Sequence, residues 1–304
     1  MKKPSRTMSE TGATPVLLQR IGLTGNVDKP EFASAVRQAV ELLQSAGRTV
    51  LADAATVRAA QLKLPARRDV AALARAVDLL LVFGGDGTML GAARAVAGLA
   101  TPLLGVNLGG LGFLTGATTA GLEGQLAQVW RGDFALDERP LIEASLRRGR
   151  SALRLPALND FVVSRGHAAR LIELEVAVDG EPLTHFRCDG LIVCSPTGST
   201  AYSLAAGGAL ICPTAEVFSV TPICPHTLSN RSVIVGLNST ISVKVVTPSP
   251  QTILSADGQV MHDLGAGDTV NIRRSRRTIR LMHLPGASFF ETLRHKLHWR
   301  GASV

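Results

Sequence analysis

The sequence contains few aromatic residues and no long apolar segment. Phe, Trp and Tyr together make up 4% of the 304 residues, and there is a single tyrosine. The longest apolar runs have the length of a strand, so we expect no transmembrane helix and no membrane partner. None of the four cysteines forms a Cys-x-x-Cys pair, and three lie in apolar segments. We therefore expect buried, reduced thiols in a cytoplasmic protein.

Several familiar catalytic motifs are also absent. There is no Gly-Lys dipeptide, which excludes a Walker A loop, and no Gly-x-Ser-x-Gly, which argues against a serine hydrolase. The glycines at 85, 87 and 91 miss the dinucleotide-binding Gly-x-Gly-x-x-Gly spacing by one residue. His295 and His298 lack companions for a metal site and fit a solvated helix end.

Positive charge is in excess, with a net charge of +8 and a pI of about 9.9. A basic chain prefers polyanions, either nucleic acid or ligands that carry several phosphates. The basic residues are scattered apart from Arg273–Arg277, which precedes Ile279 and Leu281 in a pattern typical of a strand with one solvated face. We therefore expect the charge to serve phosphate-bearing ligands and solubility, with no nucleic-acid partner.

Hydrophobic patterning divides the chain into two domains of different class. Residues 1–15 are polar and are predicted to form a disordered tail rather than a signal peptide. Residues 16–136 alternate strand and helix patterns, which predicts an α/β N-terminal domain with a parallel sheet covered on both faces. Residues 137–283 consist mostly of short strand patterns and predict a mainly β C-terminal domain. Residues 284–304 have a helical pattern and are expected to pack back on the first domain.

The most informative segment begins with Leu79–Phe83, a short run typical of a buried strand. It stops at Gly84-Gly85-Asp86-Gly87-Thr88, after which a helical pattern begins. Such a glycine turn between strand and helix binds phosphate, because backbone N–H groups approach the anion and the helix N-terminus favours negative charge. Asp86 would repel a phosphate, so we expect it to contact a metal ion or a hydroxyl that is about to be phosphorylated. A second glycine-rich loop, 107–115, follows the next strand at the same edge of the sheet.

Further candidate binding residues each have a structural alternative. Residues 195–208 carry five hydroxyl side chains and a tyrosine at a helix start, more than capping requires, so a ligand-facing surface is favoured. Asp189 is either a ligand contact or a turn cap. Asn159-Asp160 is as compatible with an ordinary turn as with a ligand site, because neighbouring strand residues point to opposite faces. Asp257-Gly258-Gln259 is predicted to be a hairpin turn.

Together these segments resemble the NAD kinase family. The matching segments are the phosphate loop Gly84–Thr88, the pair Asn159-Asp160, the glycine-rich NAD-binding stretch Asp189–Gly208, and the segments 221–229 and 257–259. The resemblance runs from about Ile21 to the C-terminal region. Asp160 stands where the family has Glu, and Ala205 stands where some relatives have Ser.

The resemblance implies transfer of the ATP γ-phosphoryl group to the 2′-hydroxyl of the adenosine ribose of NAD, which gives NADP. It also implies a divalent metal ion, normally Mg²⁺, and a homo-oligomer, a dimer or tetramer, whose sites borrow residues from a neighbouring subunit. By position, Asp86 becomes the proton acceptor and Gly87 its NAD-contacting neighbour, and Asn159 and Asp160 hold ribose hydroxyls. The other NAD-binding residues implied are Arg170, Arg187, Asp189, Thr200, Ala201, Tyr202, Ser203, Leu204, Ala205 and Gln259.

Two other functions share parts of this pattern. A diacylglycerol-type lipid kinase has a similar first loop, but the motifs of the β domain and the absence of an amphipathic membrane segment argue against it. A nucleotide-sensing or nucleic-acid-binding module without turnover also accounts for glycine loops and positive charge. Salt-dependent retention of nucleic acid without ATP consumption would favour that module.

Overall fold

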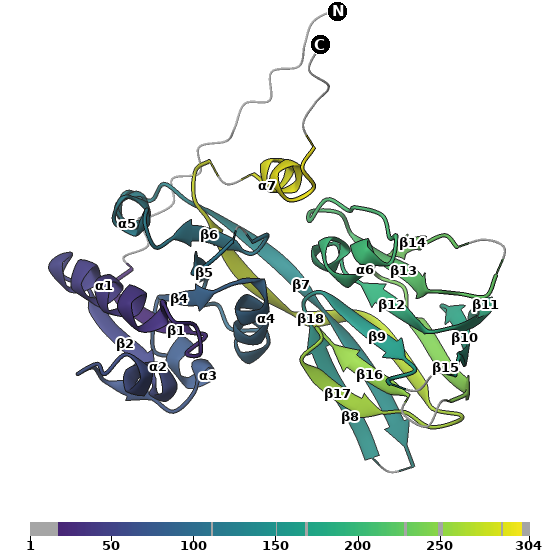
Figure 1. The fold of residues 1–304 in the computed structure, drawn as a ribbon. Coiled ribbons are helices and arrows are strands. Elements are labelled where there is room, and N and C mark those ends of the chain that lie inside the picture. The colour runs from purple at the N-terminus through teal and green to yellow at the C-terminus, as the bar shows by residue number, and fades with distance from the viewer. Residues whose placement is uncertain are drawn as a thin grey trace, which may run out of the picture.

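The computed structural model describes residues 18–110, 112–149, 151–167, 170–227, 230–248, 252–286 and 288–299. The predicted tail, residues 1–15, lies outside this part of the chain, as do residues 300–304 of the predicted C-terminal segment. Figure 1 shows two parts side by side, an α/β part formed by the N-terminal elements and a β part formed by most of the later strands.

The α/β part is built on a parallel sheet, as the sequence predicts. Strands β1, β2, β4 and β5 pair in parallel in the order β5-β4-β1-β2. Every residue of β4 is buried, which accounts for its continuous apolar sequence. The elements of this part are β1 (Arg20–Gly25), α1 (Phe32–Ser45), β2 (Thr49–Asp53), α2 (Ala54–Ala59), β3 (Ala66–Arg67), α3 (Val70–Ala74), β4 (Leu79–Gly84), α4 (Asp86–Ala95), β5 (Leu103–Asn107), β6 (Thr115–Thr118) and α5 (Leu122–Arg131).

Helices cover both faces of this sheet. Phe32 and Val36 of α1 and Leu126 of α5 pack in one apolar cluster with strand residues, whereas Leu73 of α3 and Met89 of α4 pack in another. The glycine turn before α4 is therefore fixed by burial of the strand that precedes it and the helix that follows it. Within the described ranges, no helix is long and apolar enough to cross a bilayer.

The β part is a sandwich of two sheets, and the predicted fold class is confirmed. One sheet has the order β14-β13-β12-β9-β16-β17, and the other contains β11-β10-β15-β18 with β7 and β8 attached. Phe161 and Phe218 of the first sheet pack against Leu174 and Ile272 of the second. The elements are β7 (Ala135–Arg148), β8 (Ser151–Ala157), β9 (Asp160–Ser164), β10 (Ile172–Val178), β11 (Glu181–Cys188), β12 (Gly190–Cys194), the 3-10 helix η1 (Thr197–Thr200), α6 (Tyr202–Ala205), β13 (Val217–Ile223), β14 (Val233–Gly236), β15 (Ile241–Thr247), β16 (Ile253–Ala256), β17 (Val260–Asp263) and β18 (Thr269–His283), followed by α7 (Phe289–Lys296).

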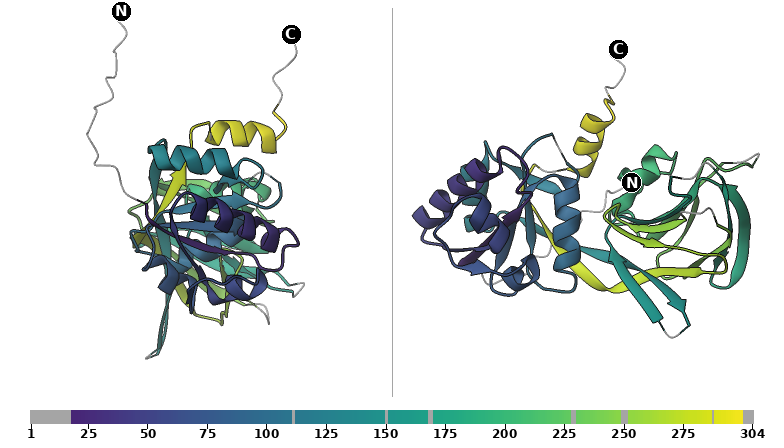
Figure 2. Two further views of the ribbon diagram at one scale, coloured as in Figure 1. Left: turned by 90° about the vertical axis from the view of Figure 1, so that its left-hand side faces the viewer. Right: turned by 60° about the horizontal axis from the view of Figure 1, so that its bottom comes forward.

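Two long antiparallel strands, β7 and β18, connect the two parts (Figure 2). At its C-terminal end β18 pairs in parallel with β5 through Leu281 and Leu103, so one sheet runs through both parts of the chain. The basic cluster lies on β18, where Arg273 pairs with Glu143 and Arg274 pairs with Glu216. The predicted strand with a solvated, charged face is confirmed there.

A buried carboxylate joins the β part to α4. Asp257 has a fully buried side chain that accepts hydrogen bonds from the backbone N–H groups of Leu158, Asn159 and Asp160, and it forms an ion pair with Arg94 of α4 at 3.0 Å. The predicted hairpin turn is confirmed between β16 and β17, with Asp257 and Gly258 both at positive φ, as type I′ turns require. The turn therefore has a second role that its sequence does not reveal.

The cysteines are only partly as expected. Cys188 and Cys194 are buried free thiols, but Cys212 and Cys224 are exposed. The expectation of burial is therefore wrong for these two. Apolar neighbours in the sequence do not bury these two thiols. Cys212 directly follows the buried Ile211 in a loop, and Cys224 follows the end of β13 in a left-handed conformation.

We predict that Arg94→Met lowers the free energy of unfolding by about 3 kcal/mol. The substitution removes the cation beside a buried carboxylate, which leaves a charge in the interior without its partner. Equilibrium denaturation in urea measures the change. Arg68→Met is the matched control, because the Arg68–Asp69 pair is exposed and screened by solvent, so its loss should hardly change stability. Equal destabilisation by the two variants would contradict the role given to Arg94.

Candidate active site

The glycine turn opens into a pocket of about 550 Å³, which we call the Lys29 pocket. Gly85, Gly87 and Thr88 at the start of α4 form one wall, and Asn26 and Lys29 from the β1–α1 loop form another. The first N–H groups of a helix have no partner within the helix, and the helix dipole adds positive potential at this end. Together with the Lys29 ammonium group, these features suit a chain of phosphates.

Asp86 points from this turn toward the second glycine-rich loop. Its carboxylate accepts hydrogen bonds from the backbone N–H groups of Phe113 at 3.0 Å and Leu114 at 2.9 Å. A Cβ atom at Gly112 would lie 2.4 Å from the Asp86 Oδ1 atom, so only glycine lets the loop approach this closely. The two glycine loops, which are adjacent at the ends of β4 and β5, thus hold one carboxylate in a defined orientation.

A second cavity, the Asn159 pocket, has Asp86 in its lining and a volume of about 270 Å³. Asp86 and Asn159 come from the two parts of the molecule, and the segment around η1 and α6 completes one side. The lining residues are Asp86, Phe113, Leu114, Asn159, Thr197, Thr200, Ala201, Leu204, Lys296 and Leu297. Asp86 therefore lines this second pocket, whereas its sequence neighbours Gly85 and Gly87 line the Lys29 pocket.

Asn159 and Asp160 face different surroundings. The Oδ1 atom of Asn159 is buried without a hydrogen-bond partner in the described part of the chain, and the residue lines the pocket named after it. Asp160, the first residue of β9, does not line that pocket and lies opposite Cys194 of β12. The structure thus brings Asn159 to Asp86 and leaves Asp160 behind the pocket wall.

The hydroxyl-rich segment 195–208 is divided between the pocket and the protein interior. Thr200 lines the Asn159 pocket, as do Ala201 and Leu204. The Ser195 hydroxyl donates to the Leu158 carbonyl oxygen at 2.6 Å, and Ser203 is fully buried with its hydroxyl 3.2 Å from that of Thr221. The predicted ligand-facing surface is therefore smaller than expected, because internal hydrogen bonds account for some of the hydroxyls.

Several predicted site residues lie away from both pockets. Asp189 forms an ion pair with Arg165 at 2.6 Å. Arg187 is exposed on β11, at the far edge of the large sheet, and Arg170 is exposed before β10. Tyr202 and Ala205 are exposed on α6. The described residues of a single chain do not bring these five side chains to Asp86.

Gln259 fixes the glycine turn. Its amide nitrogen donates to the Gly87 carbonyl oxygen at 2.7 Å, and its amide oxygen accepts from the Arg94 guanidinium. Gln259 also lines the Lys29 pocket. Gln259 thus restrains the glycine turn before α4, while Asp257 in the same hairpin restrains the backbone of Asn159.

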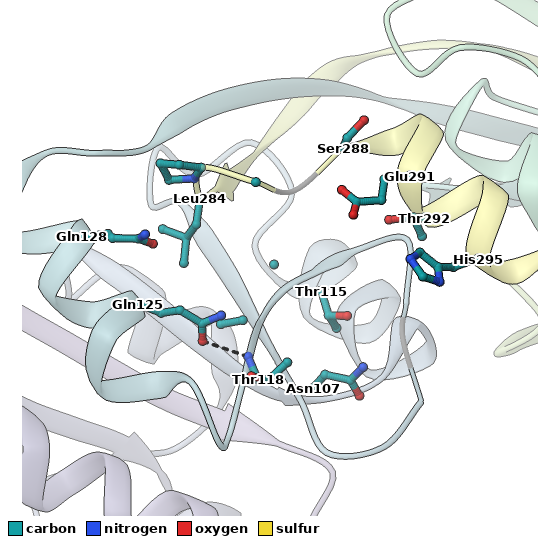
Figure 3. Close-up of a pocket in the computed structure, with 14 residues that line it drawn as sticks. Asn107, Thr115, Thr118, Gln125, Gln128, Leu284, Ser288, Glu291, Thr292 and His295 are labelled. Atoms are coloured by element: carbon teal, nitrogen blue, oxygen red, sulfur yellow. Dashed lines mark hydrogen bonds between the residues drawn. The ribbon is translucent and has the colours of Figure 1, made fainter.

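A third cavity, the His295 pocket, has a volume of about 430 Å³ and lies beside α7 (Figure 3). Glu291, Thr292 and His295 on one face of α7 point across the cavity toward Gln125 and Gln128 of α5, as Figure 3 shows. The predicted helical segment after residue 284 therefore lines both the His295 pocket and the Asn159 pocket. Its packing on the α/β part includes a contact between the Phe289 and Phe113 rings, whose centroids are 6.1 Å apart.

Comparison with known proteins identifies the family. The ATP-NAD kinase N-terminal domain matches residues 21–134, and the ATP-NAD kinase C-terminal domain matches residues 158–284. The NAD kinase of Syntrophotalea carbinolica is 42% identical over 93% of this chain and 99% of its own length. The chain belongs to the NAD kinase family.

Solved structures of this family have the same fold. Yeast NADH kinase complexed with NADH has a TM-score of 0.85 and 26% identity, covering 94% of this chain and 89% of the other. An Archaeoglobus fulgidus NAD kinase in complex with ATP has a TM-score of 0.73 and 25% identity, covering 93% and 100%. Both glycine loops, Asn159 and the α6 segment lie within the matched family domains.

Sequence reasoning missed part of this NAD kinase site. Arg94 gave no signal, because its partner Asp257 is remote in sequence. The backbone of Phe113 and Leu114 was part of a recognised glycine loop, but its contact with Asp86 depends on folding. Lys296 gave no signal either, since it belongs to a short basic helix near the chain end.

Burial changes the ionisation of Asp160. Removal from water, and next the negative charge of Asp257, raise the pKa of Asp160 to about 7. An unfolded aspartate has a pKa of about 3.9, so between about pH 4 and 7 the folded state binds an extra proton. Stability from this group is therefore greatest at low pH and falls as the pH rises through that range.

We predict that Asp160→Asn is more stable than the parent at pH 8.5 and that this advantage is much smaller at pH 5. The amide removes the cost of a buried charge, which amounts to at most roughly 4 kcal/mol above pH 7. Thermal unfolding at both pH values measures the difference. Asp263→Asn, at an exposed position, serves as the control. A difference in Tm that is the same at pH 5 and 8.5 would show that Asp160 does not titrate in this way.

Proposed function

We propose that this chain transfers the γ-phosphoryl group of ATP to the 2′-hydroxyl of the adenosine ribose of NAD, giving NADP and ADP. The observation that carries the proposal is that Asp86 lines the Asn159 pocket while its neighbours Gly85 and Gly87 line the Lys29 pocket. The family membership and the names of the matched relatives agree with it. Phosphoryl transfer requires little beyond positioning and neutralisation of charge, and this arrangement supplies both.

In the proposed reaction the triphosphate occupies the Lys29 pocket and the ribose occupies the Asn159 pocket. The acceptor hydroxyl lies against Asp86, and a ribose hydroxyl donates to the unpartnered Asn159 Oδ1 atom. As the hydroxyl oxygen forms its bond to the γ-phosphorus, the bond from phosphorus to the ADP oxygen breaks. The hydroxyl proton passes to the Asp86 carboxylate, a role worth about 10²–10⁴-fold in rate.

We propose that Mg²⁺ takes part and is held mainly by the phosphates of the substrate. The described residues contain no cluster of three or more His, Cys, Asp or Glu side chains. Mg²⁺ commonly binds one or two carboxylates together with phosphate oxygens and water, so Asp86 beside the Lys29 pocket fits as a single protein contact. When bound, the ion supplies neutralisation of the charge that develops on the transferred phosphoryl group.

We also propose that the remaining predicted NAD contacts require a neighbouring subunit. Arg170, Arg187, Tyr202 and Ala205 are exposed and lie outside the pockets of their own chain. Assembly into a dimer or tetramer would cover them and bring such residues to the Asn159 pocket of a partner. Of the predicted NAD contacts, Asn159, Thr200, Ala201 and Leu204 already line the Asn159 pocket of their own chain, whereas Gly87 and Gln259 line the Lys29 pocket. A cytoplasmic location suits the free thiols of this protein.

The other functions considered from the sequence are not favoured. A diacylglycerol-type lipid kinase shares the first glycine turn, but both family domains matched here are those of ATP-NAD kinases. A binding module without turnover does not require a pocket-lining carboxylate that two backbone N–H groups orient. The paired loops therefore favour catalysis.

The direct experiment supplies NAD, MgATP and the purified protein and measures NADP with an NADP-specific dehydrogenase. NADP and ADP should accumulate in equal amounts. Inorganic polyphosphate, NADH and diacylglycerol are tested in parallel as alternative donor and acceptors. Folded protein that makes no NADP from NAD with either ATP or polyphosphate would refute the proposal.

We predict that Asp86→Asn lowers kcat by about 100-fold or more, with little change in NAD affinity, because the amide cannot accept the proton. The amide nitrogen would also face one of the two N–H groups of the second loop. Circular dichroism and the dissociation constant for NAD therefore accompany the kinetics. Near-normal turnover would rule out Asp86 as the base.

We predict that Asn159→Ala lowers kcat/KM for NAD about five- to tenfold, equivalent to one hydrogen bond of about 1–1.5 kcal/mol. The KM for ATP should hardly change, because Asn159 lines only the pocket proposed for the acceptor. Loss of a buried, unpartnered oxygen should not itself destabilise the protein. If this variant uses NAD as well as the parent does, Asn159 does not contact the bound dinucleotide and has only a structural role.

A further inference from the structure

The Asn159 pocket has a single cationic group in its lining within the described part of the chain. That group is Lys296, in the last turn of α7. Nothing in the sequence motifs points to it, and the matched family domains end before it, at residue 284. Its place in the pocket is therefore a separate observation from those that support the proposed function.

The position of Lys296 follows from how α7 is seated. Leu293 is buried, and the Phe289 ring contacts the Phe113 ring. Residues 288, 291, 292 and 295 share one face of the helix and line the His295 pocket (Figure 3). Lys296 lies one turn after Thr292, at the edge of that row, and lines the Asn159 pocket instead.

The ammonium group lies close to the loop that orients Asp86. Lys296 Nζ lies 5.5 Å from the centroid of the Phe113 ring, and the Phe113 N–H donates to Asp86. In the described part of the chain Lys296 forms no ion pair with a carboxylate. A cation over an aromatic face keeps an attraction for a second, anionic partner, so the group is available to a ligand.

We propose that Lys296 binds the pyrophosphate of the dinucleotide acceptor and is a positioning residue for phosphoryl transfer. This inference rests on the proposed function. A dinucleotide with its ribose hydroxyl on Asp86 carries its pyrophosphate one ribose away, inside the same pocket. Two phosphate charges there need a cation, and Lys296 is the one that the pocket wall provides. Through this contact, α7 links the C-terminal segment to acceptor binding.

The first test measures steady-state kinetics of Lys296→Gln with NAD and ATP varied separately. We expect kcat/KM for NAD to fall about tenfold through KM, with kcat and the KM for ATP nearly unchanged. Lys296→Arg should restore most of the loss. Arg294→Gln is the matched control, because it removes the same charge from the same helix at a position that lines neither pocket.

The outcomes separate the possible roles. A fall in kcat alone would place the charge on the transferred phosphoryl group and overturn the proposal. An equal loss in Arg294→Gln would indicate only a general electrostatic effect and would also overturn it. If Lys296→Gln uses NAD as well as the parent does, the proposal is also overturned.

The second test identifies the phosphate as the partner. Dissociation constants for ADP-ribose and adenosine are measured in the presence of saturating MgADP. Lys296→Gln should weaken ADP-ribose binding about tenfold and leave adenosine binding unchanged, because adenosine has no phosphate. Equal weakening of both ligands would mean that the substitution only displaces α7, which overturns the proposal. This binding test does not depend on turnover, so an inactive parent protein would refute the proposed function without deciding the role of Lys296.

Discussion

The carboxylate of Asp257 is the contact on which the geometry of the site depends. It accepts hydrogen bonds from the three backbone N–H groups of residues 158–160. It also forms an ion pair with Arg94 of α4, the helix that begins at the glycine turn. One buried anion thus fixes the backbone beneath Asn159 and the helix beneath Asp86. Such a charge is tolerated in the interior only because every partner is present. This turn therefore restrains both halves of the site, in addition to the strands β7 and β18 that connect the two parts.

Preorganisation extends from that turn to the reacting carboxylate. Asp86 is held by two N–H groups of a loop from the same part of the molecule, and the loop can approach because residue 112 is glycine. Gln259 holds the other side of the turn through the Gly87 carbonyl oxygen. A carboxylate restrained in this way loses little freedom when substrates arrive, which favours catalysis by positioning.

The fold class and the two glycine loops could be predicted because each depends on local pattern. β4 is apolar throughout, and its glycine turn is visible without any tertiary information. The separation of Asn159 from Asp160 could be anticipated only as an alternative, since it depends on where β9 begins. The internal bonding of Ser203 and the pairing of Arg94 with Asp257 could not be predicted, because both partners are distant in sequence. The position of Lys296 could not be predicted either, since only the packing of α7 brings it to the Asn159 pocket.

The passage of β18 through both parts of the molecule has a consequence for synthesis on the ribosome. β6 covers residues 105–107 of β5, but the neighbour of Leu103 in the central sheet is Leu281, so this end of β5 lacks an adjoining strand until residue 281 has been made. At about 5–20 residues per second, the intervening stretch takes roughly ten to forty seconds to emerge. During that interval the start of β5 stays unpaired, and an unpaired strand edge is a known template for wrong pairing. Completion of the N-terminal half therefore waits for the C-terminal residues.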